Sequence, residues 1–409
     1  MNYSKFLKLI AGPGLAALIY LSVDLVPGKP LVTSMAAIGV WMAVWWLSEV
    51  VSLAVTALLP MIFFPILGIA DSRTTAFQYM DPIIFLFIGG FIIAFAIERW
   101  ELHQRIALRI LMKVGTSPAR ILFGVMLTSY LISMWISNTA TVMMLLSAVL
   151  AVIVQIEKHF SEEKHSHSMS TALLIGLAYS ATIGGMATLV GTPTNMIFLR
   201  EYTEKFPDNH DMNFFAWFRI GFPVSLVFLF VAFFVLKKMF IHKNTKLSLE
   251  KEYFGDAYKR LGKMSYEERM VSFIFILTAV LWFTRSNIDF GIFTMHGWGN
   301  LFKNKSYLHD STVALVMAVL LFLIPSKKEK GKALLSWEDV QKLPFDVVLL
   351  FGGGFALAKG FELSGLSGWM ATQLNFTPET NIYLLVFGLC ILVAFISEFA
   401  SNVACIQLM

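Results

Sequence analysis

Long uncharged stretches alternate with short charged segments along the whole chain, which is the pattern of a protein that crosses a membrane many times. Several stretches of 18 or more residues carry no charged side chain, the length at which an α-helix spans a bilayer. Roughly ten spans of ~20 residues fit into the chain. The clearest predicted helices cover about 9–27, 31–48, 50–69, 82–98, 216–236, 271–285, 311–325 and 345–361.

Composition narrows the class further. Hydrophobic residues make up 57% of the chain and charged residues 14%, whereas a soluble domain is about one quarter charged. We therefore predict an all-α polytopic membrane protein whose first apolar segment, following Lys5 and Lys8, is retained as a helix. The net charge of +5 lies mostly in loops and indicates orientation, not nucleic-acid binding. No phosphate loop, catalytic triad or cofactor fingerprint occurs in a credible context, so we expect no enzyme activity.

The uncharged run from Ile121 to Gln155 has an unusual length. Its 35 residues would form a helix of ~52 Å at ~1.5 Å per residue, too long for one comfortable span and too short for two with a turn. Two arms, 121–136 and 140–155, predict a re-entrant hairpin with Ser137-Asn138-Thr139 at its tip, inside the bilayer. A single, strongly tilted helix is the alternative.

A second interruption lies in the apolar run 169–199, where the motif GTPTN occupies 191–195. Proline lacks an amide hydrogen and disturbs the turn before it. The freed carbonyl groups need partners inside a membrane, and a bound cation is one such partner. A plain proline kink that neighbouring helices satisfy is the alternative interpretation.

Two blocks of the chain recur at a fixed offset of 264 residues. Ser137-Asn138 returns as Ser401-Asn402, and the block 86–102 aligns with 350–366. A single offset across separate blocks indicates a duplicated unit, and a duplicated polar motif in apolar segments is typical of a transporter whose site lies at the repeat interface. One such motif by itself could equally serve helix packing.

Basic residues predict that the two repeats are inverted. The polar segments 237–270 and 326–344 are rich in Lys and should be cytoplasmic. Counting spans from them places the N-terminus and the amphipathic segment 100–114 inside as well. The repeat partner of that segment, 364–378, has no Lys or Arg and should lie outside. We therefore expect an inverted-repeat transporter with re-entrant helical hairpins and broken helices.

Together, the segment ISNTATVMML, the helix broken at GTPTN, the block from Leu86 and the second Ser-Asn-Val copy resemble the divalent anion:sodium symporter family over essentially the whole chain. These are the INDY-type dicarboxylate carriers. The resemblance implies uptake of C4 dicarboxylates such as succinate, malate or fumarate through the cell (inner) membrane, driven by Na⁺. It also implies a homodimer with a fixed scaffold and a transport domain that moves as an elevator.

The resemblance assigns site residues to both copies of the motif. It places a first sodium site at Ser133, Ser137, Asn138 and the region of Gly191, and a second at Ser397, Asn402 and the backbone of Ala400. It places the anion between Ser137, Asn138, Thr139, Thr192 and Pro193 on one side and Ser401, Asn402 and Val403 on the other.

Two departures from the family pattern affect these expectations. Val403 stands where the first copy has Thr139, which removes a hydroxyl and leaves the choice between dicarboxylates and sulfate open. The sequence stops at Met409, whereas the repeat partner of 191–193 would fall at about 455–457, so we expect a truncated sequence with an incomplete second sodium site. A sodium-independent dicarboxylate exchanger and a non-transporting membrane protein are the rival classes. Glu398 is the one charge in the last apolar run and a candidate for a proton-linked role.

These patterns divide the chain into five predicted parts. Scaffold helices (1–80) precede the first repeat core (81–236), which contains the amphipathic surface helix, the hairpin and the broken helix. A basic cytoplasmic loop (237–270) leads to second-repeat scaffold helices and a linker (271–344), and the second repeat core (345–409) ends the chain.

Overall fold

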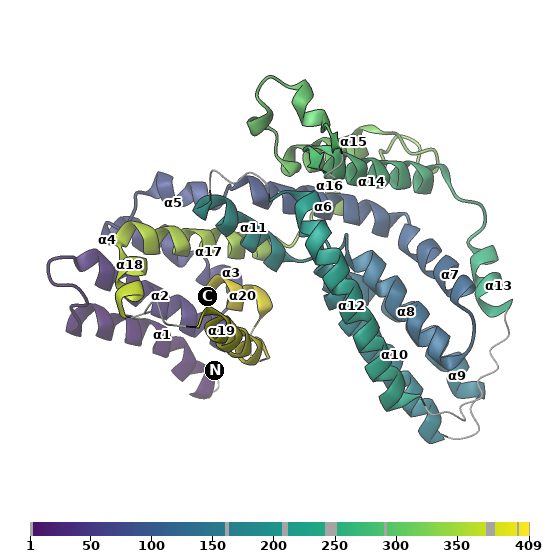
Figure 1. The fold of residues 1–409 in the computed structure, drawn as a ribbon, viewed down its shortest axis with the longest axis horizontal. Helices are drawn as coiled ribbons and strands as arrows, with labels where there is room; N and C mark the ends of the chain where they lie inside the picture. The colour runs from purple at the N-terminus through teal and green to yellow at the C-terminus, as the bar shows by residue number, and fades with distance from the viewer. Residues whose placement is uncertain are drawn as a thin grey trace. The chain divides into compact units, whose positions relative to one another are not determined.

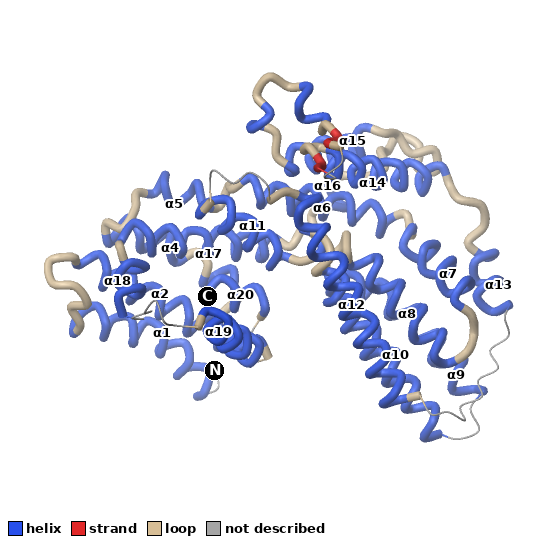
Figure 2. The backbone as a smooth tube through the Cα atoms, in the orientation of Figure 1, coloured by secondary structure: helices blue, strands red, loops and turns tan. Residues whose placement is uncertain are grey.

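A computed structural model describes residues 3–159, 163–206, 212–241, 252–289, 293–373, 381–398 and 401–408, and within them the chain is almost entirely helical (Figures 1 and 2). This confirms the all-α polytopic class. Six of the described helices or joined helix pairs are long and apolar enough to cross a membrane. The described helices and strands, in chain order, are α1 Tyr3–Ser22, α2 Pro30–Ser48, α3 Leu53–Thr56, α4 Leu59–Leu67, α5 Ser72–Gln78, α6 Pro82–Arg99, α7 Leu102–Val114, α8 Pro118–Ser133, α9 Asn138–His159, α10 Glu163–Gly185, η1 Leu189–Gly191, α11 Pro193–Lys205, α12 Phe214–Phe240, α13 Glu252–Arg260, α14 Tyr266–Thr284, β1 Ile288–Asp289, β2 Thr294–Met295, η2 Trp298–Leu301, η3 Lys305–Tyr307, α15 Asp310–Leu323, α16 Trp337–Val340, α17 Phe345–Ser364, α18 Leu366–Gln373, α19 Ile382–Ser397 and α20 Asn402–Leu408.

The first of two compact units combines residues 1–84 with 344–409. Its core forms where α2 packs against α1, α4 and α17, around fully buried side chains such as Met42, Trp46 and Phe64. Helix α17 approaches α3 closely because Gly353 has no side chain, and a β-carbon there would lie 2.5 Å from the β-carbon of Ala57. Helix α20 also rests on α17, so this unit carries the second copy of the Ser-Asn motif.

The second unit, residues 85–343, carries the first copy of the motif. Helix α10 runs along α8, α9 and α12, and these long helices lie together in Figure 1. Helix α12 exposes Val227, Val231 and Phe234, as expected of a lipid-facing helix. Helix α7 packs against α8 and α13, and Arg105 of α7 is buried against Glu268, with its Nε 3.1 Å from a carboxylate oxygen.

The helix boundaries repeat at the offset found in the sequence. Helices α7, α8 and α9 begin at residues 102, 118 and 138, and α18, α19 and α20 begin 264 residues later, at 366, 382 and 402. The residue before α7, Glu101, and its counterpart before α18, Gly365, both adopt left-handed backbone, with φ of 53° and 80°. Residues other than glycine rarely adopt this conformation, so its presence at Glu101, opposite a glycine in the second copy, supports the duplication independently of sequence identity.

Several predicted helix boundaries are wrong. The first helix begins at Tyr3 and ends at Ser22, before a turn at Gly28 with φ of 83°, and does not cover 9–27. The helix predicted over 50–69 is two short helices, α3 and α4, because Pro60 cannot donate the amide hydrogen that would continue the first.

The predicted hairpin turn is confirmed, and the single tilted helix is wrong. Helix α8 ends at Ser133, four residues form a turn, and α9 begins at Asn138. The first arm, α8, has the expected 16 residues, although it lies at Pro118–Ser133. The second arm is longer than expected, since α9 runs for 22 residues, ~33 Å at ~1.5 Å per residue. That length is sufficient to cross the hydrocarbon core, so the re-entrant character of the pair stays a prediction.

Candidate functional site

The first Ser-Asn-Thr motif lies where the hairpin turn meets α9. The Ser137 carbonyl accepts the Thr141 amide at 2.9 Å, and its hydroxyl accepts the Ala140 amide at 3.3 Å, so Ser137 caps the helix. Asn138 and Thr139 lie in the first turn of α9, which corrects the expectation that they lie at the hairpin tip together with Ser137. The positive end of the α9 dipole is therefore at the motif.

Oxygen atoms from three chain segments converge beside this cap. The Ser133 hydroxyl donates to Asn138 Oδ1 at 2.9 Å. A β-carbon built on Gly185 would lie 2.4 Å from the same Asn138 Oδ1 and 3.1 Å from the Gly191 carbonyl oxygen. A β-carbon on Gly191 would lie 2.6 Å from the Gly185 carbonyl oxygen and 3.0 Å from that of Ser133. Uncharged oxygens in a space that excludes even a methyl group are suited to a small, hard cation.

The helix break behind this cluster is longer than predicted. Helix α10 ends at Gly185, the short helix η1 covers 189–191, and α11 begins at Pro193. Thr192 is extended, with φ of −147°, and Pro193 takes the first helical position, where its missing amide hydrogen costs nothing. The break therefore spans 186–192, and Pro193 starts a helix instead of kinking one.

Sequence reasoning missed two residues, Asn195 and Thr188, whose side chains hold this break in place. Asn195 is buried, and its Nδ2 donates to the carbonyl oxygens of Gly185 at 2.9 Å and Thr188 at 2.7 Å. The Thr188 hydroxyl donates to the Met134 carbonyl of the hairpin turn. An amide side chain inside an apolar run, as Asn195 is in GTPTN, was the available signal.

The start of α20, in the other compact unit, repeats the local geometry of the start of α9. Ser397 ends α19, Ser401 precedes α20, and Asn402 and Val403 lie in its first turn. The Ser401 carbonyl accepts the Cys405 amide at 2.9 Å, as Ser137 does for Thr141. The Ser397 hydroxyl donates within its own helix, to the Ala394 carbonyl. Ala400, predicted to supply a backbone ligand, lies outside the described residues. The assembly of the two copies into one site stays a prediction.

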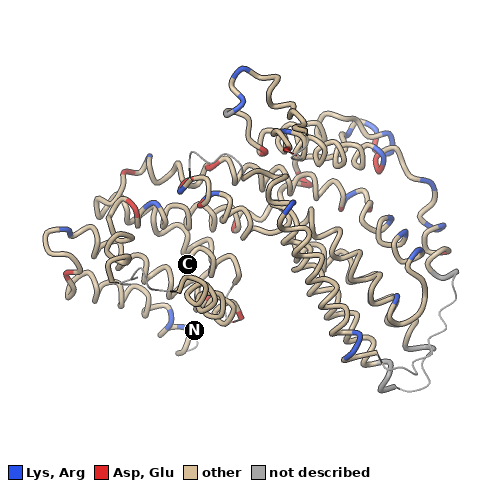
Figure 3. The backbone as a smooth tube through the Cα atoms, in the orientation of Figure 1, with Lys and Arg blue, Asp and Glu red and all other residues tan. Residues whose placement is uncertain are grey.

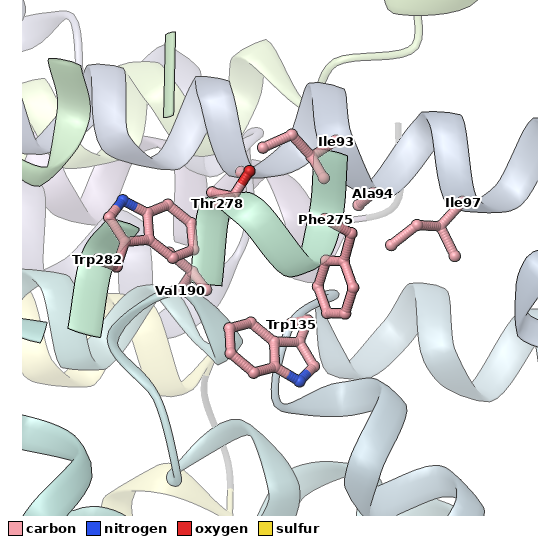
Figure 4. Close-up of a pocket in the computed structure, with 9 residues that line it drawn as sticks. Ile93, Ala94, Ile97, Trp135, Val190, Phe275, Thr278 and Trp282 are labelled. Carbon is pink, nitrogen blue, oxygen red and sulfur yellow. The ribbon is translucent and has the colours of Figure 1, made fainter. Parts of the chain in front are cut away.

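An apolar cavity lies beside the hairpin turn (Figure 4). Trp135 of the turn faces Phe275 of α14, with ring centres 5.0 Å apart and planes nearly perpendicular, and stacks on Phe214 of α12. The Thr278 hydroxyl on the wall is bonded within its helix, to the Ile274 carbonyl. The cavity has room for about one water molecule. It is too small for a dicarboxylate, and we interpret it as part of the packing that holds the turn.

Among the part of the chain that the structure describes, no group of three or more His, Cys, Asp or Glu side chains could hold a metal ion. The two described cysteines, Cys390 and Cys405, are free thiols. Within the described residues, the neutral oxygens beside Asn138 are therefore the candidate cation site.

The chain is similar to one known family and to several transporters. A family model described as the sodium:sulfate symporter transmembrane region matches residues 8–409. A sodium-dependent dicarboxylate transporter of Staphylococcus saprophyticus is 38% identical over 410 residues, covering 98% of this chain and 76% of that protein. A Na⁺/citrate cotransporter of Mus musculus is 36% identical over 438 residues, covering 90% and 76%. A sodium-dependent dicarboxylate transporter of Staphylococcus aureus is 36% identical over 375 residues, covering 90% and 69%.

Proposed function

Since the chain belongs to the sodium:sulfate symporter family, we propose that it transports C4-type dicarboxylates, such as succinate, malate or fumarate, coupled to the movement of Na⁺. It is a multi-pass membrane transporter and not an enzyme. The relatives named for dicarboxylate and citrate carriage support a carboxylate substrate. Sulfate, named in the family description, is the second candidate.

The observation that carries the proposal is the oxygen cluster at the hairpin turn. Ser133, Asn138, Gly185 and Gly191 bring hydroxyl, amide and carbonyl oxygens together, and Na⁺ is the coupled ion that the relatives' names supply. The first sodium site comprises these oxygens with Ser137. The second comprises Ser397, Ala400 and Asn402 of the other repeat.

The anion lies between the two copies of the motif in this proposal. Ser137, Asn138 and Thr139 face it from one copy with Thr192 and Pro193, and Ser401, Asn402 and Val403 face it from the other. None of these side chains is cationic. Backbone amides at the starts of α9 and α11 offer donors to a carboxylate, and bound Na⁺ offsets the remaining negative charge.

The transport cycle that we propose is an elevator movement within a homodimer in the cell membrane, with the N-terminus in the cytoplasm. The duplicated helix boundaries support two equivalent halves. The Lys-rich segments support their inverted insertion. These two features are typical of transporters that alternate access around a central site.

Coupling between sodium and substrate tests this function. Succinate binding to the reconstituted protein should weaken steeply when Na⁺ is replaced by choline at constant ionic strength, because each ligand raises the affinity of the other. Asn138→Ala should weaken sodium binding by about ten- to a hundredfold, the equivalent of ~1.5–3 kcal/mol for a lost contact to a charge.

The matched control for Asn138→Ala is Ser129→Ala on α8. It removes a buried hydroxyl that donates to the Leu177 carbonyl at 2.9 Å, one turn away from the oxygen cluster. Sodium dependence should survive in this control. Succinate binding that is insensitive to the choline replacement would favour the sodium-independent exchanger. Competition by sulfate but not succinate would favour the second substrate class.

A further inference from the structure

The segment between α14 and α15 folds into a small lobe (residues 293–307) that the proposed transport function does not use. It contains β2, η2 and η3 and projects from these helices in Figure 1. The Trp298 indole donates to the Leu281 carbonyl at 2.9 Å, and the Gly299 amide donates to the Arg285 carbonyl at 3.0 Å. A side chain at Gly297 would come within 2.3 Å of the same Arg285 oxygen. The lobe is therefore attached closely to the end of α14.

The base of the lobe is fixed by an ion pair between a half-buried Arg285 and a buried Asp310. Arg285 Nε lies 2.5 Å from Asp310 Oδ1, and Arg285 also donates to the Leu308 carbonyl. The other Asp310 oxygen accepts the Phe214 amide at 3.2 Å. The ion pair and these hydrogen bonds thus connect the start of α12, the end of α14 and the start of α15 to one another. This arrangement gives the lobe a defined position at one end of these helices.

The surface of the lobe is apolar and cationic. Leu301 is 85% exposed and Tyr307 77% exposed, and Phe293 and Phe302 are also mostly exposed. Lys303 and Lys305 lie among them, and Figure 3 shows basic positions at the outer end of the lobe. The stretch 293–309 contains no Asp or Glu. Exposed aromatic side chains together with Lys are typical of protein segments at a membrane–water interface.

The lobe connects two helices that expose apolar side chains. Helix α14 exposes Phe273, Ile276 and Val280, and α15 exposes Val316, Val319 and Leu323, as lipid-facing helices do. The lobe leaves the end of one of these helices and returns to the start of the other. Its apolar surface thus continues from helices whose exposed faces are apolar as well.

We propose that the lobe is a membrane anchor that lies in the lipid headgroup layer, with its apolar side chains directed into the bilayer and Lys303 and Lys305 bound to anionic phospholipid headgroups. The attraction of each Lys to an anionic surface adds to the burial of the apolar side chains. Such an anchor would hold the ends of α14 and α15 at a fixed depth while other parts of a transporter move.

Spin-label accessibility tests the anchor. A label at Leu301→Cys, in the chain with Cys390 and Cys405 replaced, is reconstituted in vesicles of phosphatidylglycerol with phosphatidylcholine and in pure phosphatidylcholine. We expect this label to be accessible to oxygen and several-fold less accessible to an aqueous nickel chelate than a label at exposed Lys332. A label at exposed Val227 of α12 serves as the lipid reference. The protection of the Leu301→Cys label from the nickel chelate should be greater in the vesicles that contain phosphatidylglycerol.

The double variant Lys303→Gln, Lys305→Gln separates the contribution of Lys–headgroup attraction from that of the apolar side chains. It should abolish the difference between anionic and zwitterionic vesicles while keeping part of the protection. Full nickel accessibility of the Leu301 label in both vesicles would overturn the proposal. Strong dipolar broadening between labels at Leu301 in two copies would also overturn it, because the lobe would then be a contact between copies. Neither result alters the sodium test, so the anchor and the transport function are judged separately.

Discussion

At the scale of single residues, the oxygen cluster depends on a glycine. The β-carbon of an alanine at position 185 would lie 2.4 Å from Asn138 Oδ1, a distance at which something must shift. We expect Gly185→Ala to weaken the sodium dependence of uptake about as strongly as Asn138→Ala does, while the protein still folds, because the displaced oxygen is a proposed ligand. The measurement is succinate uptake against sodium concentration. Gly388→Ala in α19, where nothing lies within 4 Å, is the matched control and should behave as wild type. Unchanged sodium dependence in Gly185→Ala would refute the cluster as a cation site.

At the scale of elements, a carboxylate attaches the turn after α15 to the first turn of α14. Glu267 precedes the apolar stretch of α14 and accepts the Ser326 hydroxyl at 2.9 Å and the amides of Lys327 and Lys328 at 2.8 and 2.9 Å. Burial by itself would raise the pKa of Glu267, but the hydrogen bonds, led by that from the Lys328 amide, outweigh it and lower the pKa to about 2. The charged form is therefore the one that the folded protein stabilises.

This lowered pKa predicts a pH dependence of stability. Because the folded pKa lies below the ordinary value of 4.5, the contribution of Glu267 is complete above pH 4.5 and is lost as the pH falls towards 2. Glu267→Gln should lower the unfolding temperature at neutral pH. It should also make the unfolding temperature fall less than in the wild type as the pH is lowered from 4.5 towards 2. Thermal unfolding in detergent at a series of pH values measures this. Glu338→Gln, on the exposed face of α16, is the control. An identical decline in wild type and Glu267→Gln would contradict the assignment.

At the scale of the whole molecule, the two repeats should enter the membrane in opposite senses. Helices α7 and α18 occupy equivalent positions of the repeat, yet α7 carries Arg105, Arg109 and Lys113 while its counterpart has no basic residue. We expect single cysteines at Gln104 and Ser367, without Cys390 and Cys405, to react with an impermeant reagent from opposite sides of the membrane. Reaction from the same side for both would end the inverted-repeat interpretation, whatever the result for sodium.

The sequence by itself determined the class, the duplication and the two interruptions. Uncharged stretches long enough to span a bilayer can be read directly, because a lipid environment tolerates few alternatives to a helix. The offset of 264 residues placed the second motif correctly, and helices α9 and α20 begin at its two Asn residues. Even the break at GTPTN was located to within a few residues, because proline and glycine act on the backbone locally.

Only the tertiary structure decided which atoms meet. Gly185 and Asn195 carry no sequence signal comparable to the Ser-Asn repeat, yet one leaves the space beside Asn138 and the other fixes two carbonyl groups by hydrogen bonds. Arg105 has the spacing of a surface residue, and its burial against Glu268 follows from packing of α7 against its neighbours. Periodicity reports how each helix is built, whereas contacts between distant segments depend on how helices pack, and that information is distributed over the whole chain.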